Sequence, residues 1–569
     1  MTTYPLTTPQ QNIWNLQKYY PNTAISNICG AVFYNDDRDV TLLKSALNAV
    51  LRSQTALRLR FTEENGEPRQ TVSDYHYEDI PVRAFSTWSE YDTFAKEQAQ
   101  TPIALTGSKM YRFQICVVEN RVGILVTLSH LIADAWSFSL IIDQVEEAYR
   151  NLRQGAETEL AQRDYIEYVL AGQDYTRSER YAKDAAFFRE HYQEKPERTA
   201  VKPENGQSQV INAGRLIQRL PETLAEKITR YSEMNSITTA VLLEAAVILY
   251  LSRMNPTNQH ITIGLLVLNR SNKNEKKTCG MFISTMPFTV EVTGQESVAA
   301  FLEKIVMGKR EFFRHQKYPY AEILKQVREK HGGEGNLYEV MVSVQNARID
   351  ARINADTYWY SNGSSEIPLA IHIDNRDGKE SHIMTVDYQQ TLFPQRAEAE
   401  LFVQRLLFLL EQMVTNDERT LQAISLIPAT EKKLLLETFN DTHAEYAKDK
   451  CVHELFAEQV GKTPEKTALI FEDKQFTYRE LDKMSNSLAH YLREKGIGRG
   501  DIVPIIAKRS WHFIVGLLGI IKAGGAYMPI SIDYPLDRIN QIIEIAKSKY
   551  VLTYDFDKNI NASQIDLKK

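Results

Sequence analysis

The stretch GILVTLSHLIADAWS (residues 123–137) decides the first part of the fold. Residues 123–128 form a continuous apolar run rich in β-formers, which is typical of a strand buried on both faces. Beyond Ser137, apolar side chains recur at helical spacing as far as Leu152, and Ser137 is a credible N-cap for that helix. The stretch therefore predicts a buried strand, a short junction and an amphipathic helix.

The junction contains a histidine, His130, and an aspartate, Asp134. Strand-to-helix junctions on a rigid scaffold often present reactive side chains, and a histidine can accept or relay a proton near neutral pH. Because side chains alternate along a strand, Ser129 and His130 are expected to face opposite ways, and we place His130 in a cleft. The spacing alone is weak, since His-x₃-Asp arises by chance and a buried, hydrogen-bonded histidine is more common than a catalytic one. Asp134 would also be favourable at a helix N-terminus simply through the helix dipole.

The rest of the chain predicts a mixed α/β protein without short repeats. Residues 41–53 indicate a helix and 56–61 a strand, and a second region of similar construction follows the polar stretch 194–208 and ends in a long helix at 398–414. We expect two lobes at 1–180 and 181–425, a polar linker at 426–450, and a third unit at 451–569. That unit opens with a helix at 452–460, a strand pair at 467–477 and a helix at 478–495.

Composition excludes several classes of function. The 569 residues are 43% hydrophobic and 25% charged, which is ordinary for a soluble globular protein, and the net charge of −6 argues against a nucleic-acid binder. Neither a signal peptide nor an apolar run of membrane-spanning length is present, so we expect a cytoplasmic protein with no membrane span. Four scattered cysteines predict no disulfide framework and no metal site. The main motifs of hydrolases, kinases, dehydrogenases and metalloproteases are missing.

The junction and six further segments, which follow the family's order, resemble the condensation domains of nonribosomal peptide synthetases. The junction SHLIADA (129–135) resembles their HHxxxDG signature. The other segments are YPLTTPQQNIW (4–14), LRSQTALRLRF (51–61), the stretch 165–171, TCGMFISTMP (278–287), HQKYPY (315–320) and LYEVMVSVQN (337–346). Each match is weak alone, but six in the family's order form a strong joint signal.

The resemblance implies two lobes of chloramphenicol-acetyltransferase type, arranged as a V-shaped pseudo-dimer with the active site at their junction. A donor acyl or peptidyl thioester and an acceptor aminoacyl thioester would enter a tunnel on 4′-phosphopantetheine arms of carrier proteins, and the chain itself would bind no cofactor. His130 would be the base or the group that positions the amine, and Asp134 an architectural carboxylate paired with Arg270. The other residues expected at the tunnel are Ser129, Ala135, Trp136, Ser137 and Asn346.

Two residues depart from the signature, because Ser129 replaces its first histidine and Ala135 its glycine. Ser129 is expected to face the lobe interior, whereas the methyl group of Ala135 could restrict the backbone or narrow the cleft. These departures keep open a degenerate module that only docks carrier proteins. Three further activities stay open as well: a starter-type acyltransferase with a fatty acyl donor, an epimerase, and an acyltransferase that uses acyl-CoA.

The third unit resembles the opening part of amino-acid-activating, adenylate-forming domains. The matching segments are VHELFAEQ (452–459), FTYREL (476–481) and IKAGGAYMPISID (521–533). The family's phosphate loop and catalytic lysine would lie beyond residue 569, so we expect a truncated adenylation domain without adenylation activity. No segment of the chain resembles a carrier domain, and the resemblance to a condensation domain begins at the first residues. The donor carrier is therefore expected to act in trans, and the acceptor carrier to belong to a missing downstream part or a separate chain.

Overall fold

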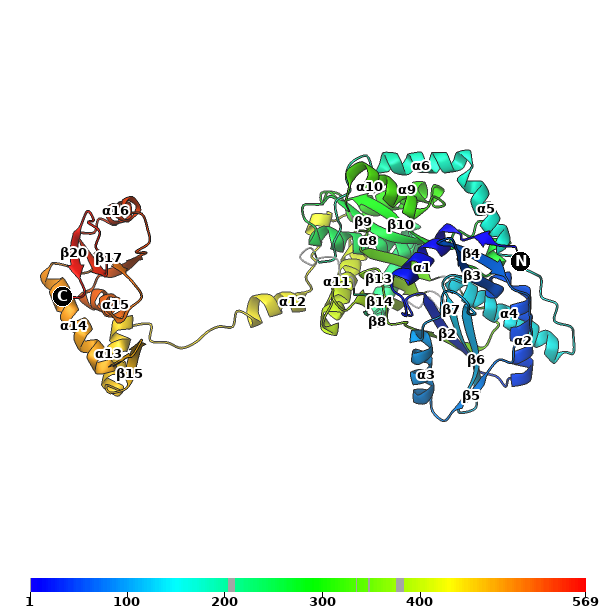
Figure 1. The fold of residues 1–569 in the computed structure, drawn as a ribbon, viewed down its shortest axis with the longest axis horizontal. Helices are drawn as coiled ribbons and strands as arrows, with labels where there is room; N and C mark the ends of the chain where they lie inside the picture. Colours follow the sequence, from blue (N-terminus) through cyan, green and yellow to red (C-terminus); the bar gives the residue numbers. More distant parts are fainter. Residues whose placement is uncertain (1, 203–209, 334, 346–347, 375–382) are drawn as a thin grey trace. The chain divides into compact units, whose positions relative to one another are not determined.

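The computed structural model describes residues 2–202, 210–333, 335–345, 348–374 and 383–569. The chain forms two compact units, residues 1–438 and 439–569, and each is described by itself. The first unit contains two lobes, each built on its own sheet (Figure 1).

The first lobe is built on a five-stranded sheet in the order β12-β2-β7-β6-β5. Alternation along β2 sends Val32 into the core beneath α2 and α4 and Phe33 into the core beneath α3, so the sheet is covered on both faces. A second sheet, β1-β4-β3, flanks it. The elements are β1 (Tyr4–Pro5), α1 (Thr8–Tyr19), β2 (Asn27–Tyr34), α2 (Val40–Ser53), β3 (Leu59–Glu64), β4 (Glu67–Val72), β5 (Val82–Phe85), α3 (Trp88–Gln100), β6 (Tyr111–Val118), β7 (Arg121–Ser129), α4 (Ala135–Arg153) and α5 (Ile166–Thr176). The next helix, α6 (Glu179–His191), packs Ala185 and Phe188 into the core of the second lobe.

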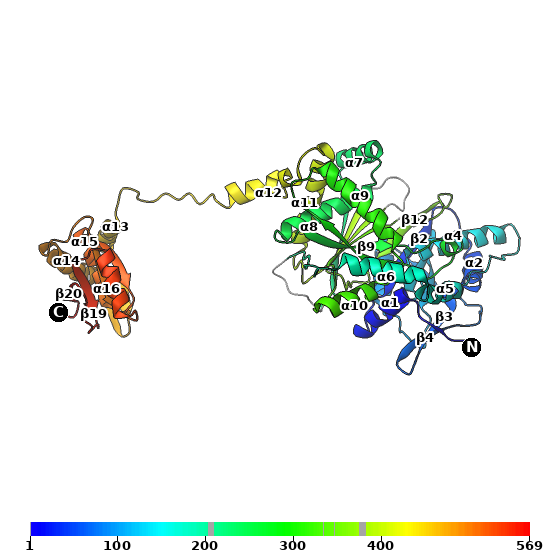
Figure 2. The same cartoon turned by 90° about the horizontal axis from the view of Figure 1, so that it is seen from above.

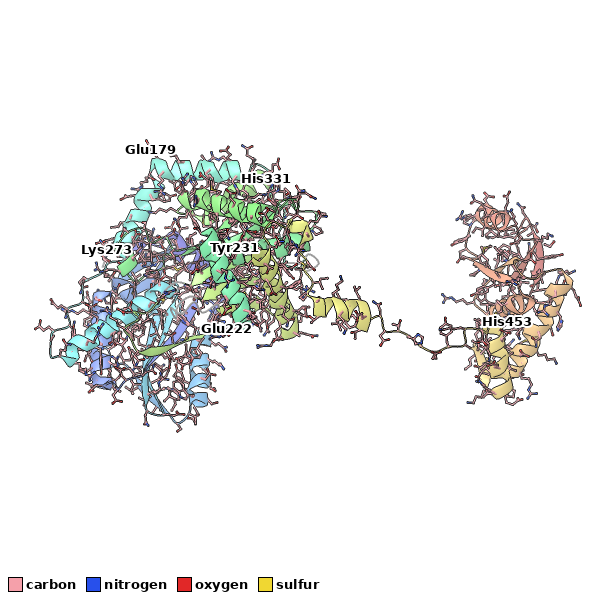
Figure 3. All side chains as sticks on the ribbon, turned by 180° about the vertical axis from the view of Figure 1, so that it is seen from behind. Glu179, Glu222, Tyr231, Lys273, His331 and His453 are labelled. Carbon is pink, nitrogen blue, oxygen red and sulfur yellow. The ribbon has the colours of Figure 1, made fainter. Side chains whose placement is uncertain are left out.

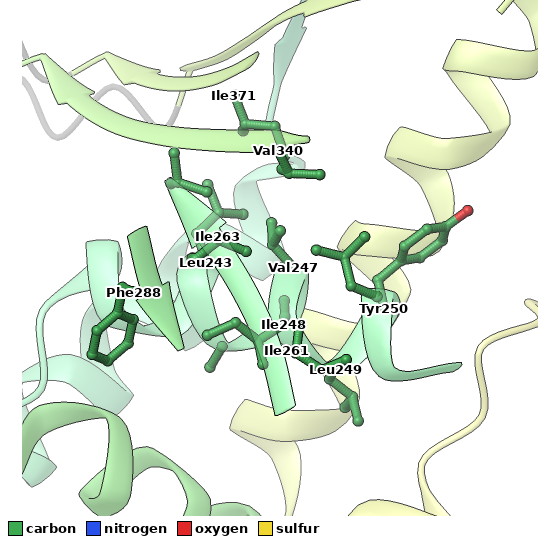
Figure 4. Packing of buried hydrophobic residues seen from close by; sticks show 14 of the residues in the cluster. Leu243, Val247, Ile248, Leu249, Tyr250, Ile261, Ile263, Phe288, Val340 and Ile371 are labelled. Atoms are coloured by element: carbon green, nitrogen blue, oxygen red, sulfur yellow. The ribbon is translucent and has the colours of Figure 1, made fainter. Parts of the chain in front are cut away.

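The second lobe is built on a six-stranded sheet in the order β10-β9-β11-β13-β14-β8. The helix α8 is apolar around most of its circumference, and Leu243 and Val247 pack beside Ile263 of β9 (Figure 4). The elements are β8 (Ala213–Arg219), α7 (Glu222–Asn235), α8 (Thr239–Met254), β9 (His260–Val267), β10 (Ser284–Glu291), α9 (Val298–Arg314), α10 (Tyr320–His331), β11 (Val340–Gln345), β13 (Leu369–Asp374), β14 (Ile383–Gln389), α11 (Arg396–Thr415) and α12 (Ala429–Lys433).

Two segments of the second lobe's part of the chain belong to the first lobe in the structure. The strand β12 (Ala355–Tyr360) follows β11 in sequence but pairs antiparallel with β2, as seen from above in Figure 2. Cys279 and Phe282 also leave the second lobe and join the hydrophobic core of the first. The two lobes therefore share a strand and part of a core.

The second unit has two helices packed on each other, α14 and α15, and a parallel sheet in the order β18-β17-β19-β20, with β15 and β16 paired separately. Its helix α15 packs its buried face on β17, and Ile505 and Ile520 lie in the same core. The elements are α13 (Val452–Lys462), β15 (Thr467–Phe471), β16 (Lys474–Thr477), α14 (Tyr478–Glu494), β17 (Ile502–Ala507), α15 (Trp511–Ala523), β18 (Ala526–Ile530), α16 (Leu536–Ile545), β19 (Tyr550–Tyr554) and β20 (Ser563–Asp566).

Most of the predicted elements are confirmed, including the buried strand β7 and the helices α2, α11 and α14. The strand predicted at 56–61 is wrong in its first half, because residues 55–58 form a 3₁₀ turn and β3 begins only at Leu59. Thr55 holds this turn, since its N–H donates to the carbonyl of Arg163 and its hydroxyl accepts from the N–H of Tyr165. Among the described residues no single helix is long and apolar enough to cross a membrane, and α7 and α8 pass that test only as a pair bent by 108°.

Candidate functional site at the junction of the lobes

His130 lies immediately after β7, in a tight turn that precedes α4. Its backbone N–H donates to the carbonyl of Ser26 (2.7 Å), and Leu131 is fully buried beyond it. Ser129 is only 2% exposed, and its hydroxyl accepts from the N–H of Leu131 (3.2 Å). His130 itself is half-buried and lines a cavity at the junction of the lobes. The two neighbours therefore have different surroundings, the lobe interior for Ser129 and the cavity for His130.

A single hydrogen bond orients the imidazole of His130. Its Nδ1 lies 3.1 Å from the carbonyl oxygen of Ala133, which can only accept, so Nδ1 carries the proton of that bond. No described residue bonds its Nε2. Burial lowers the pKa of His130, and the charge of Asp134 and the Ala133 hydrogen bond oppose this only in part. Near pH 7 the ring is neutral, with the lone pair of Nε2 left available for a ligand.

Asp134 is the N-cap of α4, where the sequence analysis placed Ser137. The carboxylate accepts from both the N–H and the hydroxyl of Ser137 (2.8 Å each), and the hydroxyl oxygen of Ser137 accepts from the N–H of Asp134 (3.3 Å). Both residue types favour N-caps, and three positions apart they form a capping box in which Asp134 is the cap and Ser137 the third helical residue. The predicted cap at Ser137 is therefore wrong by one helical turn.

A buried ion pair joins Asp134 of the first lobe to Arg270 of the second. One guanidinium nitrogen lies 2.9 and 3.0 Å from the two carboxylate oxygens, and the Asp134 and Arg270 side chains are 0% and 1% exposed. The other terminal nitrogen donates to the carbonyls of Glu275 (2.5 Å) and Thr278 (2.7 Å), and the guanidinium lies 3.9 Å from the ring centre of Phe282. This pair pins the segment after β9 to the start of α4.

The same segment, residues 275–282, is held by further bonds from the first lobe. Trp136 Nε1 donates to the carbonyl of Lys276 (3.0 Å), and the hydroxyl of Tyr165 donates to the carbonyl of Met281 (2.6 Å). A Cβ at Gly280 would lie 2.2 Å from the ring of Tyr165, so only glycine allows this approach. These bonds run to backbone carbonyls of the segment, so they hold it against the first lobe.

The cavity has a volume of about 1080 Å³ and lies between α1 and the start of β2 on one side and the sheet of the second lobe on the other. Ala135 and Trp136 line it beside His130. Ser129 and Ser137 do not, because both are buried and bonded inside the structure, which corrects their expected place at the tunnel. Asn346 lies outside the described residues, and its neighbour Gln345 lines the cavity.

A polar cluster that no pattern in the sequence predicted lies on the cavity face of the second sheet. Arg215 of β8 binds Asp387 of β14 through two bonds of 2.7 Å. His372 of β13 lies 3.5 Å from Asp387 through Nε2 and 2.6 Å from the hydroxyl of Ser343 through Nδ1. Burial raises the pKa of Asp387, but the bonds from Arg215 and His372 outweigh it and hold that pKa far below its usual range. Four separate strands supply these residues, so no local motif signals them.

The described residues contain no group of three or more histidine, cysteine, aspartate or glutamate side chains that could hold a metal ion. The buried thiols Cys29, Cys116 and Cys279 have pKa values raised by burial, Cys279 to about 12, so they remain protonated near pH 7.

Residues 1–436 match the family described as "Condensation domain", and residues 456–569 match "AMP-binding enzyme". Surfactin synthase subunit 1 of Bacillus subtilis (strain 168) is 30% identical over 572 residues, which cover 97% of this chain and 16% of the relative. Tyrocidine synthase 2 of Brevibacillus parabrevis is 26% identical over 568 residues, covering 97% and 15%. The chain thus spans less than a fifth of the length of these two relatives.

Two solved structures share the fold. A four-domain nonribosomal peptide synthetase bound to AMP and glycine superposes with a TM-score of 0.82 at 19% identity, covering 100% of this chain and 45% of that one. A variant of the starter condensation domain of rhizomide synthetase, in complex with C8-CoA, gives a TM-score of 0.66 at 19% identity and covers 74% and 98%.

Proposed function

Because the chain belongs to the condensation domain family, here followed by a partial AMP-binding domain, we propose that its cavity forms an amide bond between two carrier-borne substrates. Its relatives are nonribosomal peptide synthetases, and the predicted fold class, two chloramphenicol-acetyltransferase-like lobes followed by part of an adenylate-forming domain, is confirmed. The donor would be an acyl or peptidyl thioester and the acceptor an aminoacyl thioester, each on the 4′-phosphopantetheine arm of a carrier protein. We assign this activity to residues 1–436 and propose none for residues 456–569.

The observation that carries the proposal is that His130, neutral and in the cavity wall, has an Nε2 that no described residue bonds. The acceptor amine attacks the thioester carbonyl carbon, so a C–N bond forms and the C–S bond breaks. His130 Nε2 accepts the proton that the amine loses, and the departing thiolate takes up a proton. Ala133 fixes the tautomer that leaves Nε2 able to do this. The cavity, at about 1080 Å³, lies at the top of the size range for small-molecule sites, so it has room for the ends of two arms.

Asp134 and Arg270 are proposed to act through position alone. Neither side chain reaches the cavity surface, and their pair fixes the start of α4 next to His130. Trp136 would close the cavity beside His130 and also bond the segment from the second lobe, while Ala135 and Gln345 would contribute to its walls. Holding both substrates so that their reacting atoms meet supplies most of what an amide-forming site needs.

The first test is amide formation by the full chain with loaded donor and acceptor carriers supplied in trans. His130→Ala should lower the rate by about 10²–10⁴ if Nε2 moves the proton. His331→Ala, at the end of α10 and labelled in Figure 3, is the matched control, because His331 does not line the cavity. An unchanged rate in His130→Ala would remove this residue from the mechanism.

A fatty acyl donor is the second candidate, favoured by the aliphatic part of the cavity wall. Leu266, Leu268 and Ile283 line it together, and one neighbour in structure is described as a starter condensation domain in complex with C8-CoA. An octanoyl carrier and a leucyl carrier compared as donors would separate the two candidates. Affinity for a loaded carrier without any amide product would instead favour a module that only docks carriers.

A further inference from the structure

The polar side chains on the cavity face of the second sheet form one chain of contacts that runs from β11 to β8. Gln345 Nε2 donates to the hydroxyl oxygen of Ser343 (3.2 Å), and that oxygen lies 2.6 Å from Nδ1 of His372. Nε2 of His372 lies 3.5 Å from Asp387, which accepts two bonds of 2.7 Å from Arg215. Ser343 is only 1% exposed and does not line the cavity, so it is not placed to attack a substrate. The contacts therefore build a fixed polar strip in the cavity wall.

The two permanent charges of this strip neutralise each other. Burial alone would raise the pKa of Asp387, but the bonds from Arg215 and His372 hold it far below its usual range, so the carboxylate stays ionised. A cationic ligand would meet the guanidinium of Arg215, and an anionic ligand would meet the carboxylate of Asp387. Neither ligand would therefore gain the attraction of a free counter-charge. An uncharged polar group meets no such repulsion.

Two neighbouring hydrogen-bonding groups of the strip bond no described residue. Arg215 uses Nε and Nη2 for its contacts with Asp387, which leaves Nη1. The hydroxyl of Thr385 on β14 is the second group, and alternation places it on the cavity face while Met384 and Val386 enter the core. The Arg215 side chain is 27% exposed and lines the cavity with Thr385, so a ligand there competes with little bulk water.

The pairing of β8 with β14 fixes the separation of these two groups. Arg215 lies opposite Asp387, and Ile217 lies opposite Thr385, so Arg215 and Thr385 are diagonal neighbours on one face. The Cβ atoms of such neighbours lie roughly 7 Å apart. One ligand with an acceptor and a donor side by side can therefore bond both groups. A carboxamide carries both on one planar group, whereas a hydroxyl has a single oxygen to share.

We propose that Arg215 and Thr385 bind a side-chain carboxamide of one carried aminoacyl group, so that the cavity prefers asparagine-like or glutamine-like substrates to apolar ones. Arg215 Nη1 donates to the amide oxygen, and the amide N–H donates to the Thr385 hydroxyl. This inference rests on the proposed function, since it assumes that aminoacyl groups enter the cavity. The strip belongs to the second lobe and His130 to the first, so side-chain recognition and proton transfer use different walls.

Binding is measured first, because it needs no turnover. Isothermal titration of the full chain uses pantetheine amides of asparagine and leucine, whose side chains have nearly the same shape, and of glutamine and homoleucine, which are one methylene longer. Free α-amines mimic the acceptor, and acetylated α-amines mimic the donor. In at least one pair the carboxamide probe should bind about tenfold more tightly than its apolar counterpart. An aspartyl probe should bind less tightly than the asparaginyl probe, because its charge meets that of Asp387.

Thr385→Val keeps the shape of the side chain and removes its hydroxyl, so the preference for the carboxamide probe should fall about threefold or more. Thr62→Val makes the same change at an exposed position of β3 outside the cavity and should keep the preference. A ratio near one in every pair, no binding of the carboxamide probes, tighter binding of the aspartyl probe, or an unchanged ratio in Thr385→Val would each overturn the inference.

Amide formation with leucyl carriers is run in parallel, so that the inference and the proposed function can fail separately. Amide product without any preference between the probes would overturn the inference and leave the proposed function standing. Preference without any amide product would defeat the proposed function and leave the inference standing.

Discussion

The ion pair between Asp134 and Arg270 predicts a large loss of stability from a nearly isosteric change. Asp134→Asn keeps a good N-cap for α4, because the amide oxygen can still accept from the N–H of Ser137. The change removes the negative charge opposite a guanidinium that is 1% exposed and cannot lose its proton. Breaking a buried pair by removing one partner costs about 3–5 kcal/mol. We expect the free energy of unfolding of the first unit to fall by that amount.

Urea unfolding followed by tryptophan fluorescence measures this loss. Four of the five tryptophans lie in the first unit, so a Trp511→Phe background makes the signal report on that unit alone. With a slope of about 3 kcal/mol per molar or more, the midpoint should fall by roughly 1 M. Lys18→Met is the control, because it breaks an exposed ion pair in which the Lys18 side chain is 48% exposed and that of Glu63 is 36% exposed. It should lower the free energy of unfolding by less than about 1 kcal/mol.

The double variant Asp134→Asn with Arg270→Met separates lost charge balance from lost packing. It should be more stable than Asp134→Asn alone, because the uncompensated cation is gone. If Asp134→Asn shifts the midpoint no more than Lys18→Met does, the pair does not hold the lobes together. The carbonyls of Glu275 and Thr278 would then suffice to balance Arg270.

Two further predictions concern pH. Because burial lowers the pKa of His130, loss of its basic form should begin below pH ~6.5. In that range log kcat/KM of the unaltered chain should fall with a slope of about two per pH unit, one from protonation of the acceptor amine and one from His130, whereas His130→Ala should show a slope of about one. A slope of one in the unaltered chain would contradict this role. Burial raises the pKa of Asp143 to about 6 although the N–H of Asp350 donates to it (2.8 Å), so the native state binds more protons than the unfolded state between pH ~4 and ~6. The contribution of Asp143 to the free energy of unfolding should therefore grow as pH falls from about 7 towards about 4, so the urea midpoint of the unaltered chain should rise relative to that of Asp143→Asn over this range; equal pH dependence in both chains would refute it.

Local patterns in the sequence predicted the elements of the site better than its walls. The apolar run at 123–128 and the helical spacing beyond Ser137 were enough to place β7 and α4. A strand buried on both faces gives a continuous apolar run, whereas a helix buried on one face gives apolar residues every three or four positions. The cap was misplaced since Asp134 and Ser137 are both good N-caps, and only the geometry shows which of them begins the helix.

The walls of the cavity depend on contacts between distant parts of the chain. Arg215 and Asp387 are 172 positions apart and meet only because β8 pairs with β14. Conversely, the segment TCGMF stood out in the sequence, but its bonds to Gln54, Tyr165 and Arg270 required the structure.

The two residues that depart from the family signature have different consequences in the structure. Ser129 is enclosed in the first lobe and bonded to the N–H of Leu131, so the change from histidine alters the interior beneath the turn and no cavity wall. Ala135 is the first residue of α4, a position with helical dihedrals that any L-residue adopts, so the backbone does not require glycine there. Its methyl group lines the cavity beside His130 and narrows the space by one carbon atom. The departure at Ala135 therefore acts on which substrates fit, and the geometry that orients His130 is independent of both changes.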